Sequence, residues 1–215
     1  MSSIQGGISP KAALYIDGFN IYHSILDHGE PWLKWCNLWR LGEILCRPHR
    51  AQLVKTAFCT AVPDEARSSR GNHITYNSAL RASGVTIVTG HHMIEPSGKR
   101  LEKQSDINLA LELILDGCDD LYDIAILLTA DSDQTATARR FKERFPEKKL
   151  VAISTLGRDV PAKIKSYTKH HAQLKLNQLE EAIFGDHVAG AKGTILRPVA
   201  YAPPAWWKHP DDRAK

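Results

Sequence analysis

The chain has 215 residues, of which 43% are hydrophobic and 24% charged. This length suits one domain with short appendages, and these fractions exclude a mostly disordered chain. The 28 Lys and Arg residues against 24 Asp and Glu residues give a net charge of +4, which by itself does not indicate a polyanionic partner.

Short apolar runs alternate with segments of helical spacing along most of the chain. We expect strands over residues 12–16, 53–62, 85–89, 122–129, 150–154 and 174–176. We expect helices over residues 21–26, 38–45, 69–82, 107–115, 135–144, 161–167 and 179–184. The segment 94–103 reads as a loop, and the helix at 107–115 reads as largely buried.

This alternation predicts an α/β fold with a parallel sheet and right-handed crossovers, and the nearly continuous apolar run at 122–129 suits the centre of a sheet covered on both faces. We expect a flexible N-terminal lead over residues 1–11, one domain over 12–186 and a tail over 187–215 that contains proline and tryptophan. The tail can pack on the domain, or it can contact a protein partner or a second copy of the chain.

The four cysteines form no CxxC pair and show no zinc-like spacing with histidine. Reduced thiols and a cytoplasmic location are therefore the expectation. No stretch approaches the roughly 18 apolar residues that a membrane span needs, so we expect no membrane segment.

Carboxylates follow the predicted strands at the points where parallel sheets bind ligands. Asp17 follows the first strand, with Asn20 three residues later. Asp131 and Asp133 follow the fourth strand, and Asp106 begins the helix that leads into it. Taken singly, each of these residues is also a common turn former or helix cap, so only their joint placement favours a site.

Converging carboxylates repel one another unless a cation lies between them. Mg²⁺ and Mn²⁺ both prefer oxygen ligands, so either ion is the expected cofactor of Asp17, Asp106 and Asp131. Such an ion activates water and polarises a phosphoryl oxygen, which suits hydrolysis of a phosphodiester.

Three ordered motifs resemble the NYN domain, a branch of the PIN-like nuclease superfamily. They are Tyr15-Ile16-Asp17-Gly18-Phe19-Asn20, Lys103-Gln104-Ser105-Asp106 and Leu128-Thr129-Ala130-Asp131-Ser132-Asp133. The resemblance implies a Rossmann-like (PIN-like) parallel sheet flanked by helices on both faces. It also implies a metal-dependent ribonuclease whose catalytic residues are Asp17, Asp106, Asp131 and Asp133. It also implies supporting roles for Asn20 and Lys103.

The chain departs from the family pattern at three positions of these segments. Ser132 stands where glycine is common, Gln134 where phenylalanine is common, and Glu112 where aspartate is common. Glu112 lies six residues after Asp106, which places it roughly a third of a turn off that face of the helix, so we leave it out of the metal ligands.

Basic residues follow the acidic segment. Residues 99–134 hold nine acidic and three basic residues, whereas residues 135–170 hold ten basic and three acidic ones. Arg139, Arg140 and Lys142 are the candidates for contacts with RNA phosphates, and a solvated helix face is the alternative.

The acidic residues suggest three functions. The first is a metal-dependent ribonuclease, and the alternative is a non-catalytic RNA- or protein-binding module on the same fold. A phosphatase with an aspartate nucleophile is disfavoured, because that chemistry needs a second aspartate two residues after Asp17, where Phe19 stands.

Overall fold

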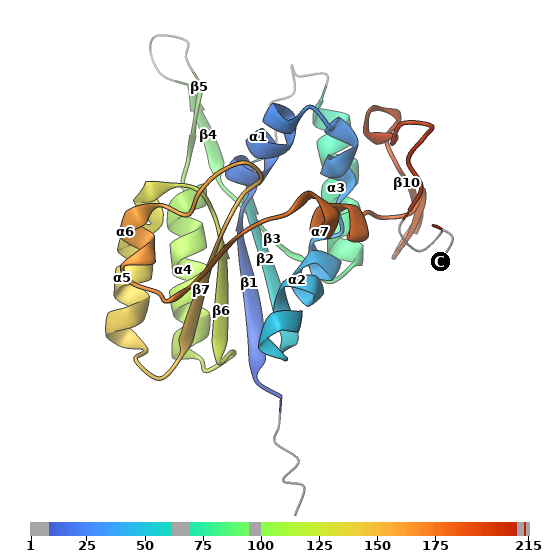
Figure 1. The fold of residues 1–215 in the computed structure, drawn as a ribbon. Coiled ribbons are helices and arrows are strands. Elements are labelled where there is room, and N and C mark those ends of the chain that lie inside the picture. Colours follow the sequence, from blue (N-terminus) through green and yellow to red (C-terminus); the bar gives the residue numbers. More distant parts are fainter. Residues whose placement is uncertain (1–8, 62–68, 95–99, 210–212, 214–215) are drawn as a thin grey trace, which may run out of the picture.

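A computed structural model describes residues 9–61, 69–94, 100–209 and 213 (Figure 1). In this part of the chain, six strands form a parallel sheet in the order β3-β2-β1-β6-β7-β8. These strands are β1 (Lys11–Asp17), β2 (Gln52–Thr60), β3 (Thr86–Thr89), β6 (Ile124–Leu128), β7 (Lys149–Ser154) and β8 (His170–Gln173). The order confirms the predicted Rossmann-like α/β fold, and it places the topological switch point between β1 and β6.

The sheet is buried on both faces because its two central strands are apolar throughout residues 12–16 of β1 and 124–128 of β6. In β1, Leu14 and Ile16 face one core, while Ala13 and Tyr15 face the other. The first core is covered by α1 (Gly18–His28), α2 (Leu38–Cys46), α3 (Arg70–Ala82) and α7 (Leu176–Glu181). The second is covered by α4 (Ser105–Cys118), α5 (Thr135–Arg144) and α6 (Ala162–Lys165), on the opposite side of the sheet in Figure 1.

Two antiparallel hairpins add to the sheet and helices. Strands β4 (His91–Ile94) and β5 (Arg100–Lys103) pair with each other, so the expectation of a loop over 94–103 was wrong at these positions. Residues 95–99 lie outside the described part. The second hairpin, β9 (His187–Gly190) and β10 (Gly193–Leu196), lies in the C-terminal tail.

The described part of the tail packs on the domain. The β9–β10 hairpin contacts α3. The ring centroid of Trp207 lies 4.7 Å from that of Trp32, in the 3-10 helix η1 (Pro31–Trp35). Tyr201, in the 3-10 helix η4 (Val199–Tyr201), is buried beside Trp35. The tail therefore completes the hydrophobic core on the α1–α2–α3 side.

Two expectations about individual elements were wrong. The last strand of the sheet is β8, four residues before the expected 174–176, because its side chains are exposed and mostly polar and give no apolar signal. Helix α4 is not largely buried, since Ile107, Leu111 and Leu115 are all more than half exposed. The remaining 3-10 helices are η2 (Arg47–His49) and η3 (Ser132–Gln134).

No helix in the described ranges is both long and apolar enough to cross a bilayer. The four cysteines are free, and of these only Cys118 is exposed.

Candidate functional site

Three carboxylates meet at the switch point of the sheet. Asp17 is the last residue of β1, Asp131 follows β6, and Asp106 lies in the first turn of α4. Each offers an oxygen atom, and these oxygens all lie within 4.8 Å of one another. We call Asp17, Asp106 and Asp131 the site carboxylates. The structure thus brings together the three residues that the sequence predicted as metal ligands.

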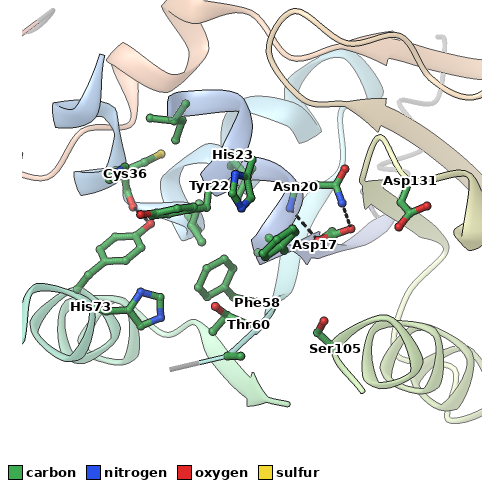
Figure 2. Close-up of a pocket in the computed structure, with 18 of the residues that line it drawn as sticks. Asp17, Asn20, Tyr22, His23, Cys36, Phe58, Thr60, His73, Ser105 and Asp131 are labelled. Carbon is green, nitrogen blue, oxygen red and sulfur yellow. Dashed lines mark hydrogen bonds between the residues drawn. The ribbon is translucent and has the colours of Figure 1, made fainter. Parts of the chain in front are cut away.

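Asp17 is fixed by neutral hydrogen-bond donors. It caps α1, and its Oδ1 accepts a hydrogen bond of 3.0 Å from the backbone N–H of Asn20. Its Oδ2 accepts bonds from the Asn20 side-chain amide at 2.5 Å and from the Thr129 hydroxyl at 3.0 Å (Figure 2 shows the two bonds from Asn20). The carboxylate therefore has one orientation, with the side chain only 2% exposed.

Two bridges hold the segments of the site in register. Asn20 Oδ1 accepts the backbone N–H of Ala130, and Thr129 Oγ1 accepts that of Asp131, which ties α1 to the loop after β6. The Gln134 side-chain amide donates to the backbone carbonyl of Asp106 at 3.1 Å, which ties the start of α4 to η3. Such supporting bonds limit how far the carboxylates can move apart.

The electrostatics of the site favour a cation. The pKa of Asp17 is raised to about 6, chiefly by burial. The hydrogen bonds from Asn20 and Thr129 oppose this rise, whereas the charges of Asp106 and Asp131 add to it. A divalent cation would relieve both the burial and the repulsion of this carboxylate. Of the three carboxylates, Asp17 is buried, Asp131 is half-buried and Asp106 is exposed. Converging carboxylate oxygens are the donor set that Mg²⁺ and Mn²⁺ take, so the residues present fit such an ion.

A glycine brings α1 close to the sheet beside Asp17. A Cβ atom on Gly18 would lie 2.5 Å from the carbonyl oxygen of Cys59 and 2.9 Å from both the Phe58 ring and the Thr60 Cβ. Glycine is thus the residue that lets α1 begin directly against β2.

The other predicted site residues lie outside the site carboxylates. Asp133 is exposed on η3, and its backbone N–H donates to Asp131 Oδ1 at 2.9 Å. Lys103 ends β5 and its backbone pairs with His91, while its side chain is outside the described structure. Arg139, Arg140 and Lys142 are exposed on α5, which begins at this edge of the sheet and runs away from it (Figure 1).

Sequence reasoning missed part of the site. A cavity of about 610 Å³ extends from the site carboxylates along α1 toward α3. Beyond Asp17 the cavity is lined by Tyr22, Phe58, His73 and Tyr76, which we call the aromatic arm. Phe58 lies nearest to Asp17, and His73 lies farther away (Figure 2). The residues of the arm come from α1, β2 and α3. No local motif joins them, so only the three-dimensional arrangement reveals the arm.

Comparison with known proteins places this site in context. The chain is 23% identical to 6-hydroxy-3-succinoylpyridine 3-monooxygenase HspA of Pseudomonas putida, in an alignment that covers 94% of this chain and 77% of that protein. A crystal structure of a Vibrio parahaemolyticus protein of unknown function superposes with a TM-score of 0.57 at 16% identity. It covers 82% of this chain and 98% of the other, and at this identity it supports the fold alone.

A family model also matches most of the chain. The model of the NYN domain matches residues 11–183, a range that holds all six strands of the parallel sheet and the three site carboxylates. The chain belongs to the NYN domain family.

Proposed function

We propose that the protein is a metal-dependent ribonuclease that hydrolyses RNA phosphodiester bonds. The observation that carries this proposal is the convergence of three carboxylate oxygens within 4.8 Å at the switch point of the sheet. Membership of a family within a nuclease-like superfamily supports the same reaction. In this proposal Asp17, Asp106 and Asp131 hold Mg²⁺ or Mn²⁺.

When bound, the divalent ion supplies Lewis acidity and lowers the pKa of coordinated water. The chain's own residues supply orientation. Asn20 and Thr129 hold the Asp17 carboxylate, and Gln134 holds the turn that carries Asp106. Preorganised ligands of this kind need no rearrangement when the substrate arrives.

The remaining predicted residues take outer roles in the proposal. The Asp133 carboxylate is the fourth catalytic candidate, at the solvent side of Asp131. Lys103 contacts phosphate or positions a carboxylate. Arg139, Arg140 and Lys142 contact RNA phosphates beyond the cavity, which makes the affinity for RNA sensitive to salt. A protein partner or a second copy of the chain would contact the tail at its exposed Leu196, Val199 and Trp206.

The direct test is cleavage of labelled RNA. Purified protein is incubated with single-stranded RNA, duplex RNA and DNA in Mn²⁺, in Mg²⁺ and in EDTA, beside the Asp17→Asn variant. We expect RNA cleavage that needs both metal and Asp17. Salt-sensitive RNA binding without cleavage in any metal would replace this proposal with the non-catalytic binding module.

The aromatic arm favours a second candidate, an enzyme that acts on a small heteroaromatic molecule. The Pseudomonas putida relative is named for oxygenation of a substituted pyridine. Mass spectrometry of a hydroxypyridine incubated with the protein, dioxygen and a two-electron donor such as NADH tests this candidate. A product heavier by one oxygen atom, formed only with the protein, would favour it over the ribonuclease.

A further inference from the structure

The cavity has two ends with different chemistry. One end holds the site carboxylates, and the other is the aromatic arm of Tyr22, Phe58, His73 and Tyr76. A volume of about 610 Å³ lies within the range of ligand pockets that bury a small organic molecule. A cation with its bound water would occupy only the acidic end, so the arm has space for another part of the ligand.

The floor of the aromatic arm is made of two buried aromatic rings. Phe58 and Tyr76 are both more than nine-tenths buried, and their rings meet edge to face at 6.3 Å. The Tyr76 hydroxyl donates to the carbonyl oxygen of Cys36 at 2.8 Å, so this polar group is satisfied within the protein. The floor therefore presents aromatic surface to whatever enters the arm.

The wall of the arm comes from α1 and carries charge and hydrogen-bonding groups. Tyr22 is half-buried, and the Lys34 ammonium lies 4.4 Å from its ring centroid. The His23 ring lies 5.4 Å from that of Tyr22, edge to face, and it also contacts the ring of Phe19 at 4.2 Å. A flat ligand between this wall and the floor would find π surface together with nearby polar groups.

Polar side chains near the arm are few and differ in kind. The cavity is also lined by the hydroxyls of Thr60 and Ser69 and by the imidazole of His73. An aliphatic ligand would make no stacking contact with the aromatic surface. A planar ring with its own donors and acceptors would use both the aromatic surface and the polar groups, as stacked and hydrogen-bonded bases do.

We propose that the aromatic arm binds a planar heteroaromatic ring whose anionic substituent reaches the cation held by the site carboxylates. The ring is either a base of the RNA next to the cleaved phosphate or a free N-heterocycle that carries a carboxylate. The first source rests on the proposed ribonuclease function, and the second does not. In either case Tyr22 and His73 determine which ring is bound.

The test is calorimetric titration of the purified protein in Mg²⁺ with three probes. Adenosine 5′-monophosphate carries a base and a phosphate, ribose 5-phosphate carries the phosphate without a base, and pyridine-3-carboxylate carries a free heterocycle. The variants are Tyr22→Leu and His73→Ala. Tyr167→Leu is the matched control, because Tyr167 is also half-buried but packs against the opposite core.

Adenosine 5′-monophosphate and pyridine-3-carboxylate are the two probes with a heteroaromatic ring. We expect at least one of them to bind at least about fivefold more tightly than ribose 5-phosphate. Tyr22→Leu should remove that advantage, while Tyr167→Leu should keep it. Electron paramagnetic resonance measures Mn²⁺ binding to Tyr22→Leu and to Tyr167→Leu. Equal affinities for Mn²⁺ would show that the carboxylate end is intact in these two variants. Tight binding of adenosine 5′-monophosphate would identify an RNA base as the ligand of the arm. Tight binding of pyridine-3-carboxylate would identify a free N-heterocycle.

The two proposals fail in different ways. Metal-dependent RNA cleavage together with equal, weak binding of all three probes would overturn the aromatic-arm inference and leave the ribonuclease standing. Absence of cleavage together with Tyr22-dependent binding of a ring would do the reverse. Identical affinities for Tyr22→Leu and Tyr167→Leu would also overturn the inference.

Discussion

Helix α4 contributes carboxylates to two separate groups, which the fold balances differently. The site carboxylates lie at its N-terminal end. Farther along, Glu112 and Asp116 meet Lys55 of β2, whose ammonium lies 2.7 Å and 2.6 Å from them. The Tyr15 hydroxyl also donates to Asp116 at 2.7 Å. We call these four residues the Lys55 cluster.

In the Lys55 cluster the balancing cation is the ammonium group of Lys55 itself. At the site carboxylates the balancing cation would be a metal ion from solution. Burial alone would lower the pKa of Lys55, but its hydrogen bonds to Asp116 and Glu112 raise that pKa overall. The hydrogen bonds that Asp17 and Asp131 accept come from neutral amides and a hydroxyl, and the pKa of Asp17 rises to about 6. Acidic side chains on one helix thus serve structure in one place and fit metal binding in the other.

The largest difference between the site carboxylates and the Lys55 cluster should appear in RNA cleavage, when one carboxylate of each group is neutralised. We expect Asp131→Asn to lower metal-dependent RNA cleavage by about 100-fold or more, because a lost ligand costs several kcal/mol of transition-state stabilisation. Glu112→Gln, the control from the Lys55 cluster, should stay within about threefold of the wild type. Single-turnover rates in Mn²⁺ measure both, and equal losses would show that the two groups act as one.

The stability of the metal-free protein should depend on pH through Asp17. Because its folded pKa of about 6 exceeds the ordinary 3.8, the folded state holds the proton more tightly. The contribution of Asp17 to the free energy of unfolding is therefore complete below pH 4. It is lost as pH rises through 6, by up to about 3 kcal/mol.

Urea unfolding in EDTA at pH 4, 5, 6 and 7 measures this dependence, with Asp17→Asn as the comparison. The variant should lose less stability over this interval than the wild type. Adding Mn²⁺ at pH 7 should stabilise the wild type and leave the variant unchanged. Parallel pH curves for the two proteins would contradict the expectation.

Breaking the Lys55 cluster should cost stability instead of activity. Lys55→Met leaves Glu112 and Asp116 without their ammonium partner. Since these side chains are 14% to 30% exposed, water offsets part of the loss, and we expect a decrease of about 2 kcal/mol in the free energy of unfolding. Lys163→Met, at an exposed position of α6, is the control and should change stability by less than about 0.5 kcal/mol. A smaller loss of stability in Lys55→Met than in the control would show that the Lys55 ammonium does not stabilise Glu112 and Asp116.

Asp133 gives the smallest and sharpest test of where the site ends. Its carboxylate is exposed, and the contact with Asp131 uses its backbone N–H, which Asp133→Asn keeps. We therefore expect Asp133→Asn to lower RNA cleavage by less than about tenfold, well below the loss for Asp131→Asn. A loss as large as that of Asp131→Asn would show that the Asp133 carboxylate itself takes part in the chemistry.

The fold and the acidic end of the site could be predicted from sequence because their signals are local. Continuous apolar runs marked the central strands, and Asp17 and Asp131 follow such runs directly. Strand β8 gave no such signal, since an edge strand with exposed polar side chains has no apolar alternation.

Contacts between distant segments gave no local signal either. Lys55 and Glu112 lie 57 positions apart, and neither residue by itself indicates the ion pair. Tyr22, Phe58 and Tyr76 of the aromatic arm read as ordinary core residues, and only the folded chain shows that they share a cavity with the carboxylates.

Gly18 has a consequence for any effort to change what the protein accepts. The residue is the first of helix α1, directly after Asp17, and a Cβ there would collide with β2. A larger side chain would displace the start of α1, and with it the cap on Asp17 and the position of Tyr22. A mutant library aimed at new ligands should therefore hold position 18 constant and vary His73 and Ser69, which line the arm from α3 and from the residue just before it. Gly18 sets the position of α1 at both ends of the cavity. The two ends can therefore be redesigned separately only while residue 18 stays a glycine.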